Sequence, residues 1–264
     1  MRILLNFTSQ TERDLTKNIR SSFISFIKKT FEVSNQSFYK SLFEFKKSKP
    51  YVFSPYFGEE FEKGKIGKAI SIIFSSGDFS VISYFWNGLL ALKENKNDFI
   101  RIEKNDFHLE NILLLQEKKV KSNQVIFKTI GVSILTDPEK SANDFKNWYI
   151  IPGKEDIERF NEVLRKRTEE RLKYIKGIEK KVNLEFLILE ENSIVETIVP
   201  HYNGYVRGFR GKFVLKGDIE VLQFLYDFGF GVRTGQGFGL LEVIENYEAK
   251  NSITQSNRRE NGKK

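Results

Sequence analysis

Glycine is concentrated near the end of the chain, where it surrounds a single arginine. Nine of the 18 glycines lie between Gly204 and Gly239, and the densest run extends from Phe228 to Gly239. Glycine is required where the backbone φ angle is positive or where the backbone closely approaches a ligand, and successive N–H groups in such a loop can bind an anion. The pattern predicts a phosphate-binding loop, with an elaborate β-turn as the alternative. The candidate ligands are Arg233, whose guanidinium suits phosphate oxygens, and five glycines: Gly229, Gly231, Gly235, Gly237 and Gly239.

This loop differs from the common nucleotide-binding motifs. In a dinucleotide fingerprint the glycines follow a strand and open a helix, whereas here they follow an expected helix and precede an expected strand. The loop also lacks the Gly-Lys-Ser/Thr ending of a nucleotide-triphosphate loop. We therefore expect no cofactor.

A basic strand is expected shortly before the glycine loop. Basic residues are interleaved with aromatic residues along residues 205–213, and alternate residues of a strand share one face. Arg207 would lie on one face of this strand, and Arg210 and Lys212 on the other. Such a surface can hold a phosphate backbone and stack on bases, although solvated charge on an edge strand is the alternative. His201, expected in the loop before the strand, could also contact RNA.

The composition argues against metal chemistry and favours an anionic partner. The 264-residue chain has no cysteine, and its two histidines, His108 and His201, are far apart in sequence. Disulfides and Cys-based zinc sites are excluded, an all-His site is disfavoured, and we expect no bound metal. The chain has 43 Lys and Arg against 35 Asp and Glu, and the resulting net charge of +8 suggests a nucleic-acid partner. No apolar run could cross a bilayer or form a signal-peptide core, so we expect a cytoplasmic protein without a membrane partner.

Hydrophobic periodicity predicts strands and helices in alternation along the first half of the chain. The expected strands are Arg2 to Phe7, Tyr51 to Phe53, Lys68 to Ser75, Phe99 to Glu103, Phe107 to Leu115 and Val125 to Ser133. The expected helices are Leu15 to Glu32, Phe38 to Phe45, and a third that Gly77-Asp78 opens and that extends to Leu92.

The second half, which begins after the turn Thr136-Asp137-Pro138, has a similar pattern. The expected helices are Lys154 to Lys176 and one that begins at Gly217-Asp218, and the expected strands are Val182 to Leu189, Ile194 to Val199, Val206 to Leu215 and Phe238 to Ile244. This order predicts an α+β fold of two tandem ferredoxin-like β-α-β-β-α-β modules with antiparallel sheets. We place the first module at residues 1–135, the second at 136–247, and a basic, disordered tail at 248–264.

The glycine loop resembles the signature of a known family. Tyr226 to Gly231, three intervening residues, and Gly235 to Val243 are similar to the C-terminal signature of the CRISPR repeat-cleaving endoribonucleases of the RAMP superfamily. Weaker similarities follow the family's order along most of the chain, up to about Asn246. They are found at Lys49 to Ser54, Ile73 to Asp78 and Thr129 to Ser133.

The resemblance implies a metal-independent enzyme that cuts precursor CRISPR RNA within each repeat. The products would carry a 5′-hydroxyl and a 2′,3′-cyclic phosphate. This chemistry needs the ribose 2′-OH in line with the scissile phosphate, groups that accept and donate a proton, and positive charge near the phosphate. The implied partner is CRISPR repeat RNA, with proteins of the interference complex as further candidates, and the protein would act as a monomer or homodimer.

The chain departs from the family pattern at the catalytic position. Many members carry a catalytic histidine before the Lys-Pro-aromatic stretch, with a tyrosine in the preceding helix and a lysine after it. Alignment on this stretch places Phe43 at the histidine, Lys28 near the tyrosine and Lys49 at the lysine. Phenylalanine cannot transfer a proton. By analogy with members that lack the histidine, we expect Lys28, Lys29 and Lys49 to surround the phosphate, because clustered cations and burial can lower a lysine pKa toward neutrality.

Other functions remain open at this stage. Without the histidine, the protein could bind repeat RNA as a scaffold subunit and not cut it. A small-molecule enzyme with a phosphate-binding loop is a third hypothesis, and it predicts affinity with little salt dependence, whereas RNA binding predicts a steep dependence. His108, expected on a sheet surface, is a weaker catalytic candidate.

Overall fold

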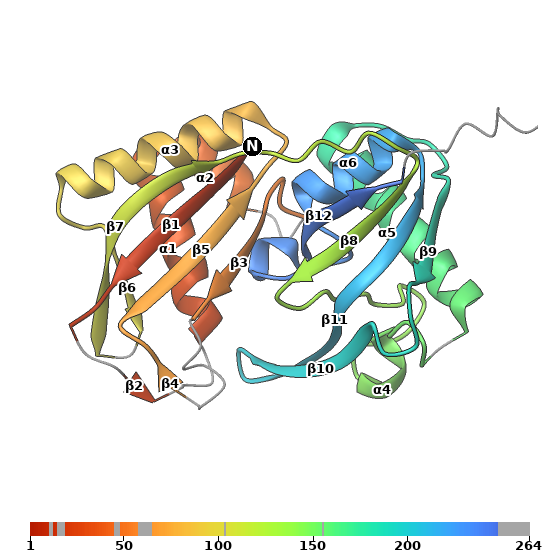
Figure 1. The fold of residues 1–264 in the computed structure, drawn as a ribbon. Helices are drawn as coiled ribbons and strands as arrows, with labels where there is room; N and C mark the ends of the chain where they lie inside the picture. The colour runs from red at the N-terminus through yellow and green to blue at the C-terminus, as the bar shows by residue number, and fades with distance from the viewer. Residues whose placement is uncertain are drawn as a thin grey trace, which may run out of the picture.

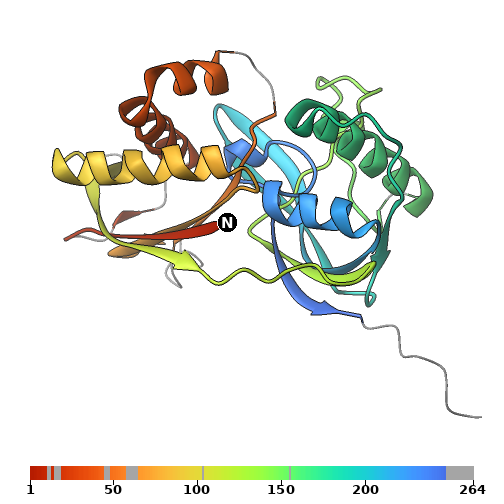
Figure 2. The ribbon, with the colours of Figure 1, turned by 90° about the horizontal axis from the view of Figure 1, so that it is seen from above.

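The chain forms two antiparallel sheets, and helices cover one face of each sheet (Figure 1). The computed structural model describes residues 1–10, 13–14, 19–44, 48–57, 65–102, 104–154 and 156–247. The expected tail at 248–264 and the first residues of the helix expected from Leu15 lie outside this range. Seen from above, the helices of both sheets lie on the same side of the molecule (Figure 2).

The first sheet has the strand order β3-β5-β1-β7-β6. Without its edge strand β6 this is the ferredoxin-like order, and the fold prediction is confirmed. The strands are β1 (Arg2–Thr8), β3 (Val52–Tyr56), β5 (Ala69–Ser75), β6 (Phe99–Ile102) and β7 (Asn105–Leu115). A separate ribbon, which the sequence analysis did not predict, pairs β2 (Arg13–Asp14) with β4 (Lys65–Ile66).

The helices of the first module are α1 (Ile19–Ser34), α2 (Gln36–Phe43) and α3 (Phe79–Glu94). Side chains alternate along β1, so that Ile3, Leu5 and Phe7 are buried in the core beneath α1. Two of the helices begin at side-chain caps, because Asn35 accepts a hydrogen bond from the Phe38 N–H and Asp78 accepts one from the Ser80 N–H. These caps fix where α2 and α3 start.

The second sheet is built around β8, which the sequence analysis had placed in the first module. The strands are β8 (Gln124–Ile130), β9 (Leu184–Ile188), β10 (Ile194–His201), β11 (Gly204–Gly217) and β12 (Leu240–Asn246). β8 pairs with β11 and β12, and β9 and β10 both pair with β11. The division between the sheets therefore falls between Leu115 and Gln124, not at residue 135. The turn at Thr136-Asp137-Pro138 lies within the second module, where Asp137 forms an ion pair with Arg159.

The helices of the second module are α4 (Phe145–Trp148), α5 (Ile157–Lys176) and α6 (Ile219–Phe228), followed by the 3-10 turn η2 (Thr234–Gln236). The expected helices at 154–176 and after Gly217 are confirmed, whereas α4 and η2 were not predicted. α5 ends at Gly177, which adopts a left-handed conformation with φ 69°. Phe213, Leu225 and Leu241 belong to one core that joins α6 to the sheet.

Contacts between residues distant in sequence join the two modules at the end of α6. The Arg2 guanidinium donates a hydrogen bond of 2.8 Å to the Tyr226 carbonyl, and its carbon lies 3.6 Å from the centre of the Tyr226 ring. The Ser75 hydroxyl donates to the Asp227 carbonyl at 3.0 Å. Both donors come from the first sheet, and both acceptors directly precede the glycine loop.

Candidate nucleic-acid interface

Two of the three predicted lysines converge on the ring of Phe43. Lys28 comes from α1, Phe43 ends α2, and Lys49 lies in the segment that leads into β3. The Nζ atoms of Lys28 and Lys49 lie 5.5 Å and 5.1 Å from the ring centre. The negative face of an aromatic ring attracts cations at such distances. Phe43 therefore provides a platform that holds two positive charges near each other, and we name Lys28, Phe43 and Lys49 the lysine cluster.

Lys49 is the more enclosed of the two lysines. Its Nζ donates a hydrogen bond to the carbonyl of Leu42, in the last turn of α2, where a cation is favoured by the helix dipole. Burial and, secondly, the charge of Lys28 lower the pKa of Lys49. A lowered pKa makes this ammonium a better proton donor near neutral pH.

Lys29 lies apart from the lysine cluster. Its Nζ donates to the Asn97 carbonyl at 3.2 Å and lies 5.1 Å from the centre of the Phe99 ring. Asn97 lies between α3 and β6, and Phe99 is the first residue of β6. The structure therefore brings Lys28 and Lys49 together and directs Lys29 to the other side of α1.

The glycine loop, residues 229–239, contains the backbone conformations that its composition predicts. Four of its five glycines have positive φ angles, namely 90° at Gly229, 70° at Gly231, 88° at Gly237 and 79° at Gly239. Gly235 is needed for a different reason. A Cβ atom there would lie 2.6 Å from Lys49 Cγ and 2.9 Å from Lys49 Cβ. The absence of a side chain at Gly235 lets the loop pack directly on the lysine cluster.

The glycine loop also packs on β3 of the first module. A Cβ atom at Gly229 would lie 2.8 Å from Val52, and one at Gly237 would lie 3.1 Å from Phe53. Several loop N–H groups donate to backbone carbonyls, including Phe230 to Gly239 at 2.7 Å and Val232 to Ile134 at 2.8 Å. These N–H groups are therefore not free to bind a phosphate. The predicted anion-binding nest is therefore in large part a bonded turn that joins the modules.

Arg233 and His201 lie on and beside this loop. Arg233 adopts a left-handed conformation with φ 59°, and its guanidinium carbon lies 5.5 Å from the centre of the Trp148 ring. His201 is not in a loop as predicted, because it ends β10 and pairs with Gly204. Its Nε2 lies 2.9 Å from Gln236 Oε1, and burial chiefly lowers the pKa of its ring, which favours the neutral imidazole at neutral pH.

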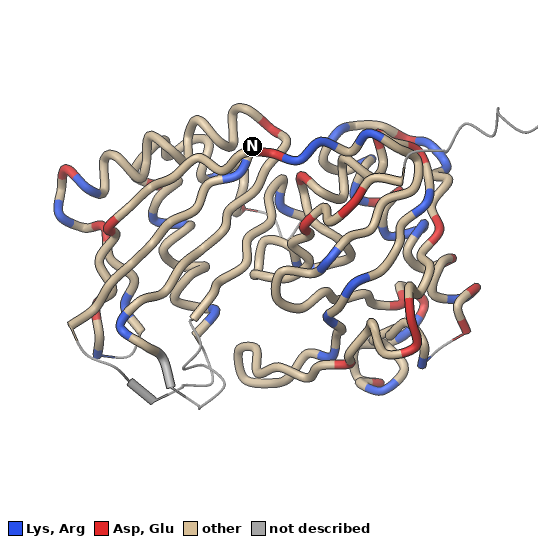
Figure 3. The backbone as a smooth tube through the Cα atoms, viewed as in Figure 1, with Lys and Arg blue, Asp and Glu red and all other residues tan. Residues whose placement is uncertain are grey.

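The three basic residues predicted on β11 have different environments. The side chain of Arg207 is only 13% exposed, forms an ion pair with Glu196 and donates to the Lys146 carbonyl at 2.9 Å. Its charge is therefore compensated within the protein. Arg210 and Lys212 are exposed on the sheet face that the helices do not cover. Lys212 pairs in register with Lys128 of β8, and both strands carry basic positions along this face (Figure 3).

His108 and Arg20 are two further basic side chains, and they lie in different environments. His108 is exposed on β7, where its ring contacts Phe99 at 5.7 Å, so it lies on a sheet surface as expected. Arg20, in the first turn of α1, had no signal in the sequence analysis. Its guanidinium carbon lies 4.8 Å from the centre of the ring of Phe238, so it reaches the glycine loop from the first module.

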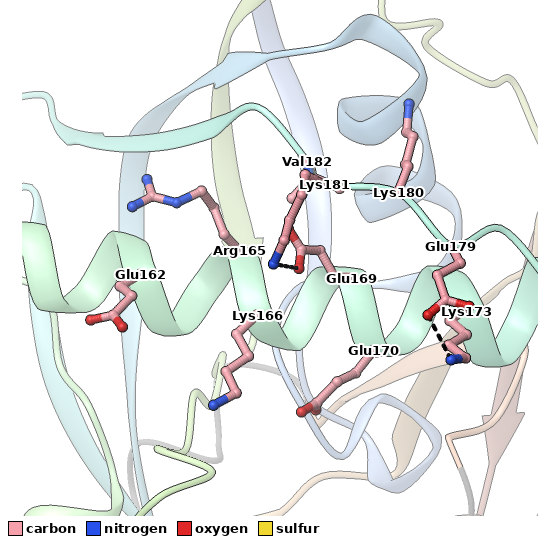
Figure 4. Close-up of a pocket in the computed structure, with 10 residues that line it drawn as sticks. All are labelled: Glu162, Arg165, Lys166, Glu169, Glu170, Lys173, Glu179, Lys180, Lys181 and Val182. Carbon is pink, nitrogen blue, oxygen red and sulfur yellow. Dashed lines mark hydrogen bonds and ion pairs between the residues drawn. The ribbon is translucent and has the colours of Figure 1, made fainter.

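A groove of about 860 Å³ runs along α5 and residues 179–182, away from the glycine loop (Figure 4). Its charged side chains are largely paired, with each other or with residues outside the groove. Lys181 pairs with Glu169 at 3.2 Å and Lys173 with Glu179 at 2.8 Å. Such compensated charge attracts an anion weakly. The lysine cluster and the glycine loop are therefore the stronger candidates for binding RNA.

Within the part of the chain that the structure describes, no three His, Asp or Glu side chains are grouped in a way that could hold a metal ion. Over the same residues, no helix is long and apolar enough to span a membrane.

Comparison with known proteins gives the class of this molecule. Residues 115–243 match the family model for the C-terminal part of the CRISPR-associated protein Cas6. A CRISPR-associated endoribonuclease-like protein Cas6 from Pyrococcus furiosus is 25% identical over 177 residues, which cover 67% of this chain and 68% of that protein. A second such protein, Cas6nc from Pyrococcus horikoshii, is 26% identical over 67% of this chain and 69% of its own.

Solved structures share the fold over nearly the whole chain. A Cas6-related protein from Pyrococcus furiosus has a TM-score of 0.76 at 22% identity and covers 94% of this chain and 99% of its own. A RAMP protein described as binding different RNA substrates has a TM-score of 0.74 at 22% identity, over 93% and 100% of the two chains.

The fold of this chain, two tandem ferredoxin-like modules, is shared with these two solved structures, one of a Cas6-related protein and one of a RAMP protein. The match to the model for the C-terminal part of Cas6, over residues 115–243, covers most of the second module. This match also begins before β8, in agreement with the sheet pairing. The resemblance to the CRISPR repeat-cleaving endoribonucleases is thus confirmed at the level of a Cas6-type RAMP protein.

Proposed function

We propose that this protein is a metal-independent endoribonuclease that cleaves precursor CRISPR RNA within its repeats. The names of its curated relatives support a role in CRISPR RNA processing in general terms. The observation that carries the more detailed proposal is the contact between Gly235 and Lys49, because it joins the Cas6-type C-terminal module to the lysine cluster.

The proposed reaction is an internal transesterification. The ribose 2′-oxygen attacks the adjacent phosphorus, the bond from phosphorus to the 5′-oxygen breaks, and the products are a 2′,3′-cyclic phosphate and a 5′-hydroxyl. Solvent accepts the proton of the 2′-OH, and the Lys49 ammonium donates a proton to the leaving 5′-oxygen. Lys28 adds positive charge that stabilises the phosphorane. Alignment of the nucleophile supplies a further part of the rate enhancement, of order 7 kcal/mol or more in well-oriented intramolecular reactions.

The lowered pKa of Lys49 supports its role as the proton donor. An ordinary lysine, with a pKa of about 10.4, is a weak proton donor at neutral pH. General acid catalysis improves as the pKa of the donor approaches the working pH. The lysine cluster lowers this pKa by partial burial and by the neighbouring charge of Lys28. Lys29, which contacts Asn97 and Phe99, has no role in this mechanism.

A scaffold function is the second candidate, and Phe43 is the observation that favours it. Phe43 occupies the position where many family members carry a catalytic histidine, and its ring can neither accept nor donate a proton. In this alternative the same surface binds repeat RNA and does not cut it.

The test is to incubate the purified protein, in EDTA, with end-labelled RNA that carries its host's own repeat. We expect cleavage that persists in the chelator, that a single 2′-deoxy substitution at the cut site abolishes, and that leaves a cyclic phosphate. Tight, salt-dependent binding without cleavage would favour the scaffold function. Binding that does not weaken with salt would contradict both functions, because RNA binding releases counterions.

A further inference from the structure

Arg20 is half-buried, and the described part of the protein does not compensate its charge. Its Nε atom is buried and has no hydrogen-bond partner among the described residues. Burial lowers the pKa of the guanidinium to about 10, and no carboxylate opposes this shift. An enclosed cation without a partner is unfavourable in a folded protein.

Other enclosed arginines of this chain have protein acceptors. Arg171, which is fully buried, donates hydrogen bonds of 2.5 Å to the Gly229 carbonyl and 2.7 Å to the Phe228 carbonyl. Arg2 donates to Tyr226, and Arg207 pairs with Glu196. Among the described residues, Arg20 has the face of the Phe238 ring and no acceptor for its buried Nε–H. Arg2 Nε is also buried without a hydrogen-bond partner, but the Arg2 guanidinium has the Tyr226 carbonyl. A guanidinium with no acceptor among the described residues indicates a group retained for a ligand.

Arg233 brings a second positive charge close to Arg20 and to the neutral ring of His201. His201 contacts the same Phe238 ring, with ring centres 5.2 Å apart, and the charges of Arg233 and Arg20 both act on His201. These three side chains come from different elements, α1, β10 and the glycine loop, and they meet around Phe238 and Gln236. Two arginine cations lie here, and among the described residues no carboxylate acts on Arg20, so an anion would complete the site.

We propose that Arg20 and Arg233 together bind one backbone phosphate of the RNA at the junction of α1 and the glycine loop. This inference rests on the proposed RNA-binding function. A guanidinium offers a planar pair of N–H donors that matches phosphate oxygens, so two of them can hold one phosphate from opposite modules. Lys28 lies eight residues further along α1, or about 12 Å, so this phosphate lies a short distance along the strand from the proposed cleavage site.

The first experiment compares stability with RNA affinity in an Arg20→Met variant. Methionine keeps an apolar stem over Phe238 and removes the charge. We expect the thermal midpoint of the free protein to stay the same or rise, and the affinity for single-stranded repeat RNA to fall about tenfold or more, as for loss of a charge-assisted hydrogen bond. A fall in the thermal midpoint with unchanged affinity would assign Arg20 a purely structural role and overturn the inference.

Two further variants make the comparison specific. Arg20→Lys keeps the charge and should retain more of the affinity than Arg20→Met. Arg165→Met is the matched control, because Arg165 lies on α5 in the groove of paired charges and donates to the Leu184 carbonyl at 3.3 Å. We expect this control to leave RNA affinity unchanged. An equal loss in Arg165→Met and Arg20→Met would mean that net charge alone is measured, which would contradict a defined site.

The second experiment locates the phosphate. Neutral methylphosphonate linkages are introduced into the RNA one position at a time, and binding is measured with the native protein and with Arg20→Met. We expect one linkage to weaken binding to the native protein and to have no further effect on the variant. If the two losses multiply at every position, Arg20 contacts no single phosphate. If the native protein itself fails to bind RNA, the proposed function fails with the inference, whereas native binding that Arg20→Met leaves intact overturns the inference alone.

Discussion

Phe43 holds two ammonium groups near each other without offering either of them a proton acceptor. Lys28 and Lys49 lie 5.5 Å and 5.1 Å from the centre of its ring. The ring face offsets part of their mutual repulsion, and the remainder contributes to the lowered pKa of Lys49. A phenylalanine at the expected histidine position can therefore support lysine chemistry, although it takes no part in proton transfer.

This arrangement predicts how the cleavage rate depends on pH. The proposed donor acts in its ammonium form, so the cleavage rate should fall as pH rises through the pKa of Lys49. Because this pKa is lowered, the fall should begin at a lower pH than for an ordinary lysine, whose pKa is about 10.4. The Lys28→Met variant removes the neighbouring charge, raises the pKa of Lys49 and should shift this fall to higher pH. Single-turnover rates across neutral to alkaline pH provide the measurement. An unchanged profile in Lys28→Met would argue against Lys49 as the donor.

The sequence predicted part of this site. Lys28 and Lys49 were identified by aligning the chain with a family motif. Hydrophobic periodicity alone does not indicate which lysines lie near each other. Lys29 was included because it is adjacent to Lys28, but consecutive residues of a helix point about 100° apart, so the same helix cannot direct both to one phosphate. Arg20 was missed because its lack of a partner is a property of the packed molecule and has no local sequence signal.

Among the elements, the end of α6 is the most heavily supported by side chains from elsewhere. The Tyr226 carbonyl accepts from Arg2 of β1, the Asp227 carbonyl from Ser75 of β5, and the Phe228 and Gly229 carbonyls accept from Arg171 of α5. The last carbonyls of a helix have no partner within the helix, and cations are favoured there. These contacts fix the point at which the glycine loop leaves the helix.

Arg171→Met tests this support. The substitution leaves two buried carbonyls without donors, so we expect the free energy of unfolding to fall by about 2 kcal/mol or more. Chemical denaturation of the variant and the native protein is the measurement. RNA binding should weaken as well, because the loop loses its fixed starting point. Unchanged stability would show that the loop is held by its packing on β3 alone.

Gly235→Ala tests the contact between the glycine loop and the lysine cluster. Gly235 is not among the glycines with a positive φ, so alanine introduces a clash with Lys49 without backbone strain. We expect Lys49 to be displaced and single-turnover cleavage to fall by at least tenfold, since small misplacements of reacting groups have large effects on rate. Gly204→Ala is the control, because a Cβ there meets nothing within 4 Å. Equal rates in the two variants would contradict the account.

The elements themselves were largely predictable, and their partners were not. Hydrophobic periodicity predicted a strand from Val125 to Ser133, which corresponds to β8 (Gln124–Ile130), but placed it in the first module. The pairing of β8 with β11 and β12 depends on contacts far apart in sequence. β8 is the first strand of the second module, which the predicted division at residue 135 left without one. His201 was expected in a loop for a similar reason, since β10 extends two residues beyond the predicted end at Val199.

In the whole molecule, both modules contribute side chains to the proposed site at their junction. The first module contributes the lysine cluster and Arg20, and the second contributes the glycine loop, Arg233 and His201. Gly235 packs on Lys49, and Phe238 packs on Arg20, so both contacts cross the junction. RNA bound here would contact both modules.

The most direct test of the central claim is the single-turnover cleavage rate of host repeat RNA in EDTA, measured for the native protein, Lys49→Met and Lys29→Met. If Lys49 is the general acid, the cleavage rate of Lys49→Met should be lower by about a hundredfold or more, and its RNA affinity should be nearly unchanged. Lys29→Met, which alters a neighbouring lysine outside the lysine cluster, should cleave at close to the native rate. Equal cleavage by native protein and Lys49→Met, or a loss confined to Lys29→Met, would contradict the account.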